Sequence, residues 1–155
     1  MRIAFGCDHA GLKLKQCVME TLSQLGAAVE DFGTDSPAST DYCIYAERVA
    51  RAVAEGRADL GILACGTGVG MAIAANKVPR VYAAHASDPY TARMAREHNG
   101  ANVLTIGARV VGEGLAEEIV RAFVQTAPSQ VDRHVRRRQQ VVDLERNALC
   151  GGQTK

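Results

Sequence analysis

Residues 61–76 read GILACGTGVGMAIAAN, and this stretch decides the fold. The apolar run Leu60–Ala64 predicts a buried strand, which stops at Cys65. A glycine loop, residues 66–70, follows and leads into a short apolar helix. Glycines allow a tight turn that points successive backbone N–H groups at one spot, and the start of a helix adds partial positive charge there. The stretch therefore predicts a thiol beside a site for a phosphate or an oxyanion.

The same strand-then-helix order repeats along the chain. Apolar runs predict strands at Ile3–Cys7, Val29–Phe32, Leu60–Cys65, Val81–His85 and Val103–Ile106. Helical spacing predicts helices that end at Gly26, at Gly56 (after a start at Thr40 or Asp41), before Pro79, at Glu97 (after a cap at Ser87) and near Pro128, with a last helix over Val131–Leu149. Five such units in a row predict an α/β, three-layer Rossmann-like fold, in which helices flank both faces of a five-stranded parallel sheet.

The composition indicates one globular domain. The 155 residues are 47% hydrophobic and 23% charged, with a formal net charge of +1. This near-neutral chain offers no broad basic surface for nucleic acid or an anionic membrane, and no apolar run is long enough to span a bilayer. The N-terminus enters a predicted strand without signal-peptide anatomy, so we expect a cytoplasmic protein. Residues 1–150 are predicted to form the domain, and residues 151–155 a frayed tail.

The cysteines and histidines do not form metal-site patterns. The five cysteines, at positions 7, 17, 43, 65 and 150, include no Cys-x-x-Cys pair, which argues against a disulfide framework or a structural zinc. Most of them are predicted to be small apolar core residues, with Cys65 as the exception. The four histidines are scattered and lack His-x-x-x-His pairing, so no metal site and no cofactor is predicted.

Polar and glycine residues follow four of the predicted strands. Ligands of open parallel sheets bind at the carboxyl ends of the strands. We therefore expect four segments to meet at that edge: Cys7–Gly11, Cys65–Gly70, His85–Asp88 and Gly107–Arg109.

The glycine loop has more than one interpretation. Gly68-x-Gly70 resembles the start of a dinucleotide fingerprint, with Asp88 at the spacing of a ribose-binding acid, but Ile73 occupies a position that needs Gly or Ala. A tight structural turn is a further alternative. The favoured interpretation is an anion or oxyanion cradle. There the helix start favours the thiolate of Cys65, whereas a free thiol is only a few per cent ionised near neutral pH.

Other candidates also have structural alternatives. His9 could be a hydrogen-bonded structural residue, and His98, next to Asn99, could simply end a helix. Arg133 and Arg137 lie one helical turn apart and could clamp a phosphate, although such a run is commonly solvated surface. Their helix follows the complete sheet, so it could reach a site in a neighbouring subunit.

Several motifs occur along the chain: IAFGCDHAG (3–11), TDY (40–42), CGTGVG (65–70), AANK (74–77), R-x-HN (96–99), NVL (102–104), G-x-RVVG (107–112) and RH-x-x-R (133–137). Taken together, they are similar to the motifs of the ribose-5-phosphate isomerase B family, which also contains the galactose-6-phosphate isomerase subunits. The similarity covers roughly residues 1–145, and Cys43 departs from it where many members carry Pro.

The resemblance implies a metal-free aldose–ketose isomerase that acts on D-ribose 5-phosphate and D-ribulose 5-phosphate, a pentose phosphate pathway reaction, through a cis-enediolate. It implies a homodimer, sometimes paired into a tetramer, with active sites shared between subunits and the C-terminal helix docked on the partner. Cys65 would be the base, Thr67 a proton shuttle and His98 the group that opens the sugar ring. The substrate-binding residues would be Asp8, His9, Tyr42, Gly66, Gly68, Val69, Gly70, Asn99, Arg109, Arg133 and Arg137.

Two alternatives remain open. The substrate could be another sugar phosphate, such as allose 6-phosphate, galactose 6-phosphate or a tetrose phosphate. Outside enzymology, the chain could be a Rossmann-type nucleotide-binding module, against which Ile73 already counts.

Overall fold

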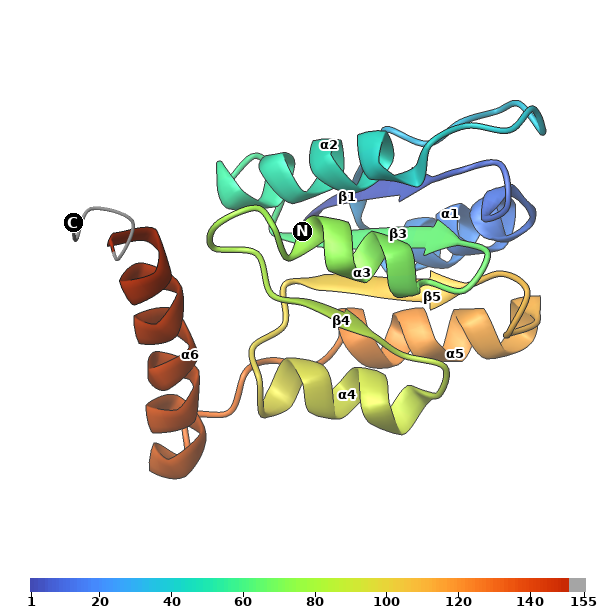
Figure 1. Ribbon diagram of the computed structural model, residues 1–155. Helices are drawn as coiled ribbons and strands as arrows, with labels where there is room; N and C mark the ends of the chain where they lie inside the picture. The colour runs from blue at the N-terminus through green and yellow to red at the C-terminus, as the bar shows by residue number, and fades with distance from the viewer. Residues whose placement is uncertain (151–155) are drawn as a thin grey trace.

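The computed structural model describes residues 1–150 and shows one five-stranded parallel sheet (Figure 1). The strands are β1 (Arg2–Cys7), β2 (Ala28–Asp31), β3 (Leu60–Cys65), β4 (Ala83–His85) and β5 (Val103–Gly107). Their order is β2-β1-β3-β5-β4, and every ladder is parallel. The strand order reverses between β1 and β3, which is where such sheets open a crevice for ligands. The predicted parallel sheet is confirmed.

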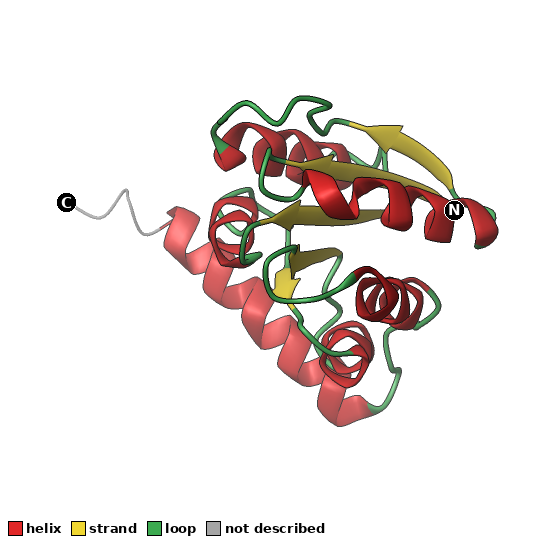
Figure 2. Cartoon of the chain, turned by 90° about the vertical axis from the view of Figure 1, so that its right-hand side faces the viewer, coloured by secondary structure: helices red, strands yellow, loops and turns green. Residues whose placement is uncertain are grey.

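Helices cover both faces of the sheet, as predicted (Figure 2). They are α1 (Lys15–Gln24, after a short 3-10 turn at Leu12–Leu14), α2 (Tyr42–Ala54), α3 (Val69–Ala75), α4 (Pro89–Glu97), α5 (Glu113–Val124) and α6 (Asp132–Cys150). The larger core, with Phe5, Ile62, Leu104 and Phe123, lies under α1, α4 and α5. A smaller core with Leu63 and Met71 lies under α2 and α3. The two cores hold the strand ends in fixed positions.

The element boundaries follow the local chemistry of the chain. Gly26 and Gly56 adopt φ of +69° and +73° just after α1 and α2, so both predicted helix stops are confirmed. The predicted cap of α4 at Ser87 is wrong. Asp88 caps the helix instead, because its Oδ1 accepts a hydrogen bond from the backbone N–H of Thr91 at 2.7 Å.

The strand β4 is shorter than predicted. It begins at Ala83 because Asn102 engages the preceding segment: its Oδ1 accepts from the N–H of Tyr82 and its amide nitrogen donates to the carbonyl of Arg80, both at 2.8 Å. These side-chain bonds hold the segment that precedes the strand. The predicted frayed tail, residues 151–155, lies outside the described residues.

The prediction that most cysteines lie in the core is wrong. Cys7 and Cys65 are buried at strand ends, but Cys17 is half-buried, and Cys43 and Cys150 are exposed on α2 and at the end of α6. Hydrophobic residue type alone did not distinguish the two faces of these helices.

The last helix stands apart from the sheet. α6 lies beside the amino-terminal ends of the strands, whose arrowheads point away from it (Figure 1). His134 is its one buried residue, and Val141, Leu144 and Leu149 are exposed. Within residues 1–150, none of the helices combines the length and apolar character needed to cross a membrane.

Candidate active site

The thiol of Cys65 is held by the glycine loop. Cys65 is the last residue of β3, and its Sγ accepts a hydrogen bond from the backbone N–H of Gly68 at 3.1 Å. Gly68 adopts φ +81°, and a Cβ there would lie 2.6 Å from Nδ1 of His85. Only glycine fits this turn, which turns the N–H group back onto the sulfur. A hydrogen bond from an N–H group at a helix start suits a thiolate.

The end of β5 supports the loop from below. A Cβ on Gly107 would lie 2.6 Å from the carbonyl oxygen of Thr67, so the two backbones are in direct contact. The N–H of Arg109 donates to the carbonyl of Gly66 at 2.9 Å. The Arg109 side chain also lies against Gly66, because a Cβ on that glycine would be 3.6 Å from its Cδ and Cζ. The exposed cationic side chain of Arg109 thus lies beside the glycine loop.

The turn after β1 brings Asp8 and His9 to the same edge. Asp8 is buried, and its Oδ1 accepts hydrogen bonds from the N–H groups of Ala10 and Gly11 at 2.9 and 2.8 Å. A side chain on Gly11 would fall on the carbonyl of Ala64, so this turn packs directly against the end of β3. Nδ1 of His9 accepts from the N–H of Thr40 at 3.2 Å, which leaves Nε2 as the donor of a neutral ring.

The ring of Tyr42 borders the glycine loop. A Cβ on Gly70 would lie 2.8 Å from Cζ of Tyr42, so the ring covers the first turn of α3. Cys43, and to a lesser extent burial and Cys65, hold the pKa of Tyr42 above its usual range, so its hydroxyl remains protonated. The strand-end segments predicted to meet at this edge do so.

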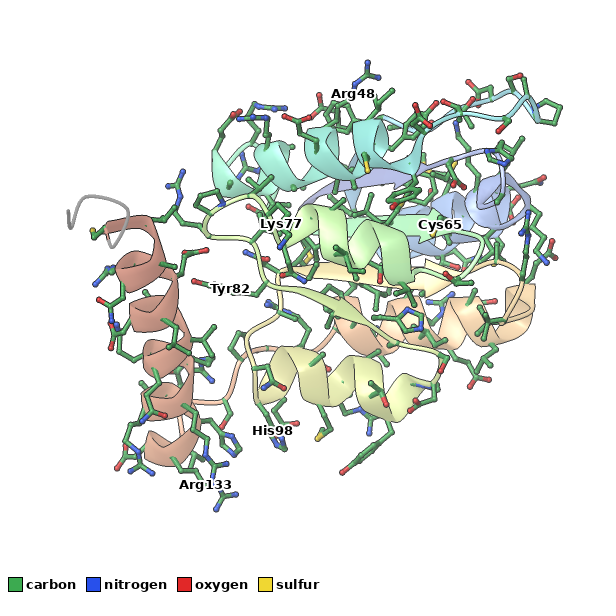
Figure 3. The ribbon with its side chains drawn as sticks, viewed as in Figure 1. Arg48, Cys65, Lys77, Tyr82, His98 and Arg133 are labelled. Atoms are coloured by element: carbon green, nitrogen blue, oxygen red, sulfur yellow. The ribbon has the colours of Figure 1, made fainter. Side chains whose placement is uncertain are left out.

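A second group of predicted residues lies at the opposite edge. His98 follows α4, which runs back from the end of β4, and it therefore lies near the amino ends of the strands. His98 and residues of α6 together line a cavity of about 430 Å³. Its lining is Tyr82, His98, Asn99, His134, Arg137, Arg138 and Val141. Figure 3 shows Cys65 and His98 at opposite ends of the sheet, with Arg133 beside His98. The structure brings the predicted site together only as two separate halves.

Two residues of this second half were not singled out from the sequence. The His134 ring stacks on that of His98, with ring centroids 4.2 Å apart and planes 13° from parallel. Tyr82 also lines the cavity. The sequence signal for His134 was its place beside Arg133 in the RH-x-x-R motif. The predicted helix-end role of His98 is confirmed for its backbone, whose N–H donates to the carbonyl of Met94 at 2.9 Å.

The geometry opposes a dinucleotide site. Both carboxylate oxygens of Asp88 bind Thr91 as a helix cap, which removes the acid required for a ribose. The helix after the loop, α3, has only 7 residues, and Ile73 on it is exposed. Among residues 1–150, no three His, Cys, Asp or Glu side chains are grouped closely enough to hold a metal ion.

An open parallel α/β sheet that carries a thiol on a glycine loop is typical of an enzyme for an anionic substrate, and comparison with known proteins specifies the family. The family described as Ribose/Galactose Isomerase matches residues 3–141, and the chain belongs to this family.

Individual relatives agree with the family assignment. Ribose-5-phosphate isomerase B of Escherichia coli is 48% identical over 144 residues, which is 93% of this chain and 96% of that protein. Galactose-6-phosphate isomerase subunit LacB of Clostridium acetobutylicum is 43% identical, over 81% of this chain and 72% of its own length. The structure of Clostridium thermocellum ribose-5-phosphate isomerase B superposes with a TM-score of 0.91 at 44% identity, over 96% of this chain and 99% of that one.

Proposed function

We propose that this chain interconverts D-ribose 5-phosphate and D-ribulose 5-phosphate in the cytoplasm, with Cys65 as the base. The observation that carries the proposal is the Cys65 sulfur, which accepts the Gly68 N–H at 3.1 Å within the glycine loop. The thiolate takes the proton from C2 of the open-chain aldose. The electrons of the broken C2–H bond form the C1–C2 double bond, and the π electrons of the C1 carbonyl move onto O1, which gives a cis-enediolate. The same proton returns from sulfur to C1 and gives the ketose.

The other site residues interact with the oxygen atoms of the sugar and of its phosphate. The N–H groups of residues 66–70 stabilise the negative charge of the enediolate, an effect that usually contributes most in such sites. The hydroxyl of Thr67 moves a proton between O1 and O2. Asp8 and Tyr42 hold the sugar, and His9 and Arg109 bind the phosphate from the same side as Cys65.

We infer that a second copy of the chain completes the site. His98 opens the furanose ring, Asn99 holds a hydroxyl, and Arg133 and Arg137 bind the phosphate, but all four lie at the opposite end of the sheet from Cys65. In a homodimer, each Cys65 half-site meets the His98 half-site of the partner. Exposed apolar residues on α3 and α6, such as Ile73 and Leu144, supply surface for this contact.

The substrate assignment is tested by turnover of purified sugar phosphates. We expect the highest kcat/KM with ribose 5-phosphate, and lower values with allose 6-phosphate, galactose 6-phosphate and erythrose 4-phosphate. A second candidate function, galactose 6-phosphate isomerisation, is favoured by the match to the LacB subunit. A higher kcat/KM with galactose 6-phosphate would select that alternative. A dinucleotide that raised the melting temperature would support the nucleotide-binding alternative instead.

A further inference from the structure

His134 makes contacts that a surface histidine does not make. It is the one buried side chain of α6, with 6% of its surface exposed, on a helix that is otherwise largely in solvent. Its ring lies flat on the His98 ring at a centroid distance of 4.2 Å. The contact joins two segments that are far apart in sequence, at the point where the ring-opening group of the proposed mechanism is held.

The hydrogen bonding of His134 fixes its protonation. Nε2 accepts a hydrogen bond from Nε of Arg133 at 3.2 Å, and an arginine can only donate. Nε2 therefore carries no proton, and the neutral ring is protonated on Nδ1. Burial lowers the pKa of His134, and His98 together with Arg133, Arg137 and Arg138 lowers it further. Oε1 of Glu97 lies 3.7 Å from Nε2 of His98.

We propose that His134 is a positioning residue with two separable roles: its ring fixes the plane of His98, and its Nε2 orients the guanidinium of Arg133. This inference rests on the proposed isomerase function, in which His98 and Arg133 touch the substrate. His134 itself binds no phosphate through Nε2, because that atom is already occupied by Arg133.

The exposed position of His98 explains why it needs a neighbour that fixes its ring. Its side chain is 38% exposed at the end of α4, where the backbone leaves the helix at Gly100 with φ +67°. Two rotatable bonds would let an unsupported imidazole occupy several rotamers. Proton transfer to a ring oxygen needs one orientation, and a displacement of about 1 Å can cost roughly a hundredfold in rate. The His134 ring, at stacking distance, favours that orientation of His98. It does not compete with His98 for the proton that is transferred to the sugar.

Three substitutions separate the two roles. His134→Phe keeps a flat ring and removes the acceptor. His134→Gln keeps an acceptor and removes the ring. His134→Ala removes both. Arg136→Ala is the matched control, because it removes an exposed cation from the same helix outside the cavity lining.

The kinetic parameters for ribose 5-phosphate give the first measurement. For His134→Phe we expect kcat within about threefold of the wild type and KM raised roughly tenfold, as for a weakened charge-assisted contact. For His134→Gln we expect KM within about threefold and kcat lowered at least roughly tenfold. His134→Ala combines both losses, and Arg136→Ala changes neither. If the Phe and Gln variants both behave like Ala, or all three like wild type, the two-role assignment is wrong.

A spectroscopic measurement is independent of turnover. Stacking places the ring protons of His98 in the ring current of His134, so their NMR signals should move on His134→Gln and His134→Ala but stay close to wild type on His134→Phe. Unchanged His98 signals in His134→Gln would show that the His134 ring does not position His98. If the wild-type chain turned over no sugar phosphate while these shifts appeared as expected, the proposed function would fail and the positioning contact would stand.

Discussion

At the scale of single residues, two buried cysteines on adjacent strands have different chemistry. Cys7 ends β1 in the core, where burial raises the pKa of its thiol to about 11. Cys65 ends β3 at the glycine loop, and its sulfur accepts the N–H of Gly68. Cys7 therefore stays a thiol at neutral pH, whereas Cys65 lies where we propose the base of the reaction. In the sequence, only the glycine loop after Cys65 distinguishes Cys65 from Cys7.

Replacing Cys65 by serine should abolish isomerisation and preserve binding. The serine hydroxyl is nearly isosteric, but it is far too weak a base near pH 7. We expect kcat for ribose 5-phosphate to fall at least about a hundredfold, or about 2.7 kcal/mol, with the dissociation constant for the substrate within about threefold of wild type. Steady-state kinetics and calorimetry measure the two quantities. A variant that kept more than about a tenth of wild-type turnover would remove Cys65 from the mechanism.

Cys7 should make the fold sensitive to alkali. Its ordinary pKa is 9.0 and its folded pKa is about 11, so above pH 9 the unfolded chain binds fewer protons than the native one. The free energy of unfolding therefore falls as pH rises from 9 to 11, by about 3 kcal/mol from this group at most. Urea unfolding at several pH values should show a smaller fall for Cys7→Ala than for wild type. Parallel curves for the two proteins would show that Cys7 does not contribute.

At the scale of elements, the contact between β5 and the glycine loop can be tested with two glycines. Gly107→Ala would press a methyl group onto the backbone of Thr67, so we expect about 1–3 kcal/mol lower stability and reduced turnover. Gly114→Ala is the control: no atom lies within 4 Å of its added Cβ, and α5 gains up to about 1 kcal/mol of helix propensity. Thermal unfolding and kcat measure both effects. Equal stability of the two variants would contradict the close contact.

The position of α6 depends on a carboxylate near its end. Both oxygens of Glu145 accept the N–H of Arg80, at 3.0 and 3.2 Å, and Arg80 is held at φ +69°. We expect Glu145→Ala to loosen α6 and to raise KM for ribose 5-phosphate severalfold, roughly 1 kcal/mol for one charge-assisted contact. Asp143→Ala is the control, because Asp143 bonds only Gln139 of the same helix among the described contacts. A KM equal to that of the control would mean that Glu145 does not position α6.

The extent of sequence prediction differs between elements. Strands such as Leu60–Cys65 are long apolar runs, and their predicted limits match the structure. The start of β4 and the cap of α4 depended on side-chain hydrogen bonds from Asn102 and Asp88, which periodicity does not encode. The Cys65 half of the candidate site was predictable because it is local to strand ends. The stacking of His134 on His98 was not, because it depends on how a distant helix docks.

At the scale of the whole molecule, the distribution of the candidate residues is the main feature. The groups proposed to hold and deprotonate the sugar lie at the carboxyl ends of the strands, and the group proposed to open its ring lies at the other end, beside α6 (Figure 3). One copy of the chain cannot bring both to one substrate molecule. In the homodimer that we propose, twofold symmetry brings both groups together and forms two equivalent sites.

The most direct test of shared sites mixes two defective variants, Cys65→Ser and Arg137→Ala, under conditions of subunit exchange. Each is assayed alone and mixed, at ribose 5-phosphate concentrations below the wild-type KM, where the binding defect of Arg137→Ala limits the rate. In a mixed dimer one site carries both substitutions and the other carries neither. Shared sites therefore predict that an equal mixture recovers about a quarter of wild-type activity. No recovery after exchange has been verified by mass spectrometry would show that Arg137 does not complete the partner's Cys65 site.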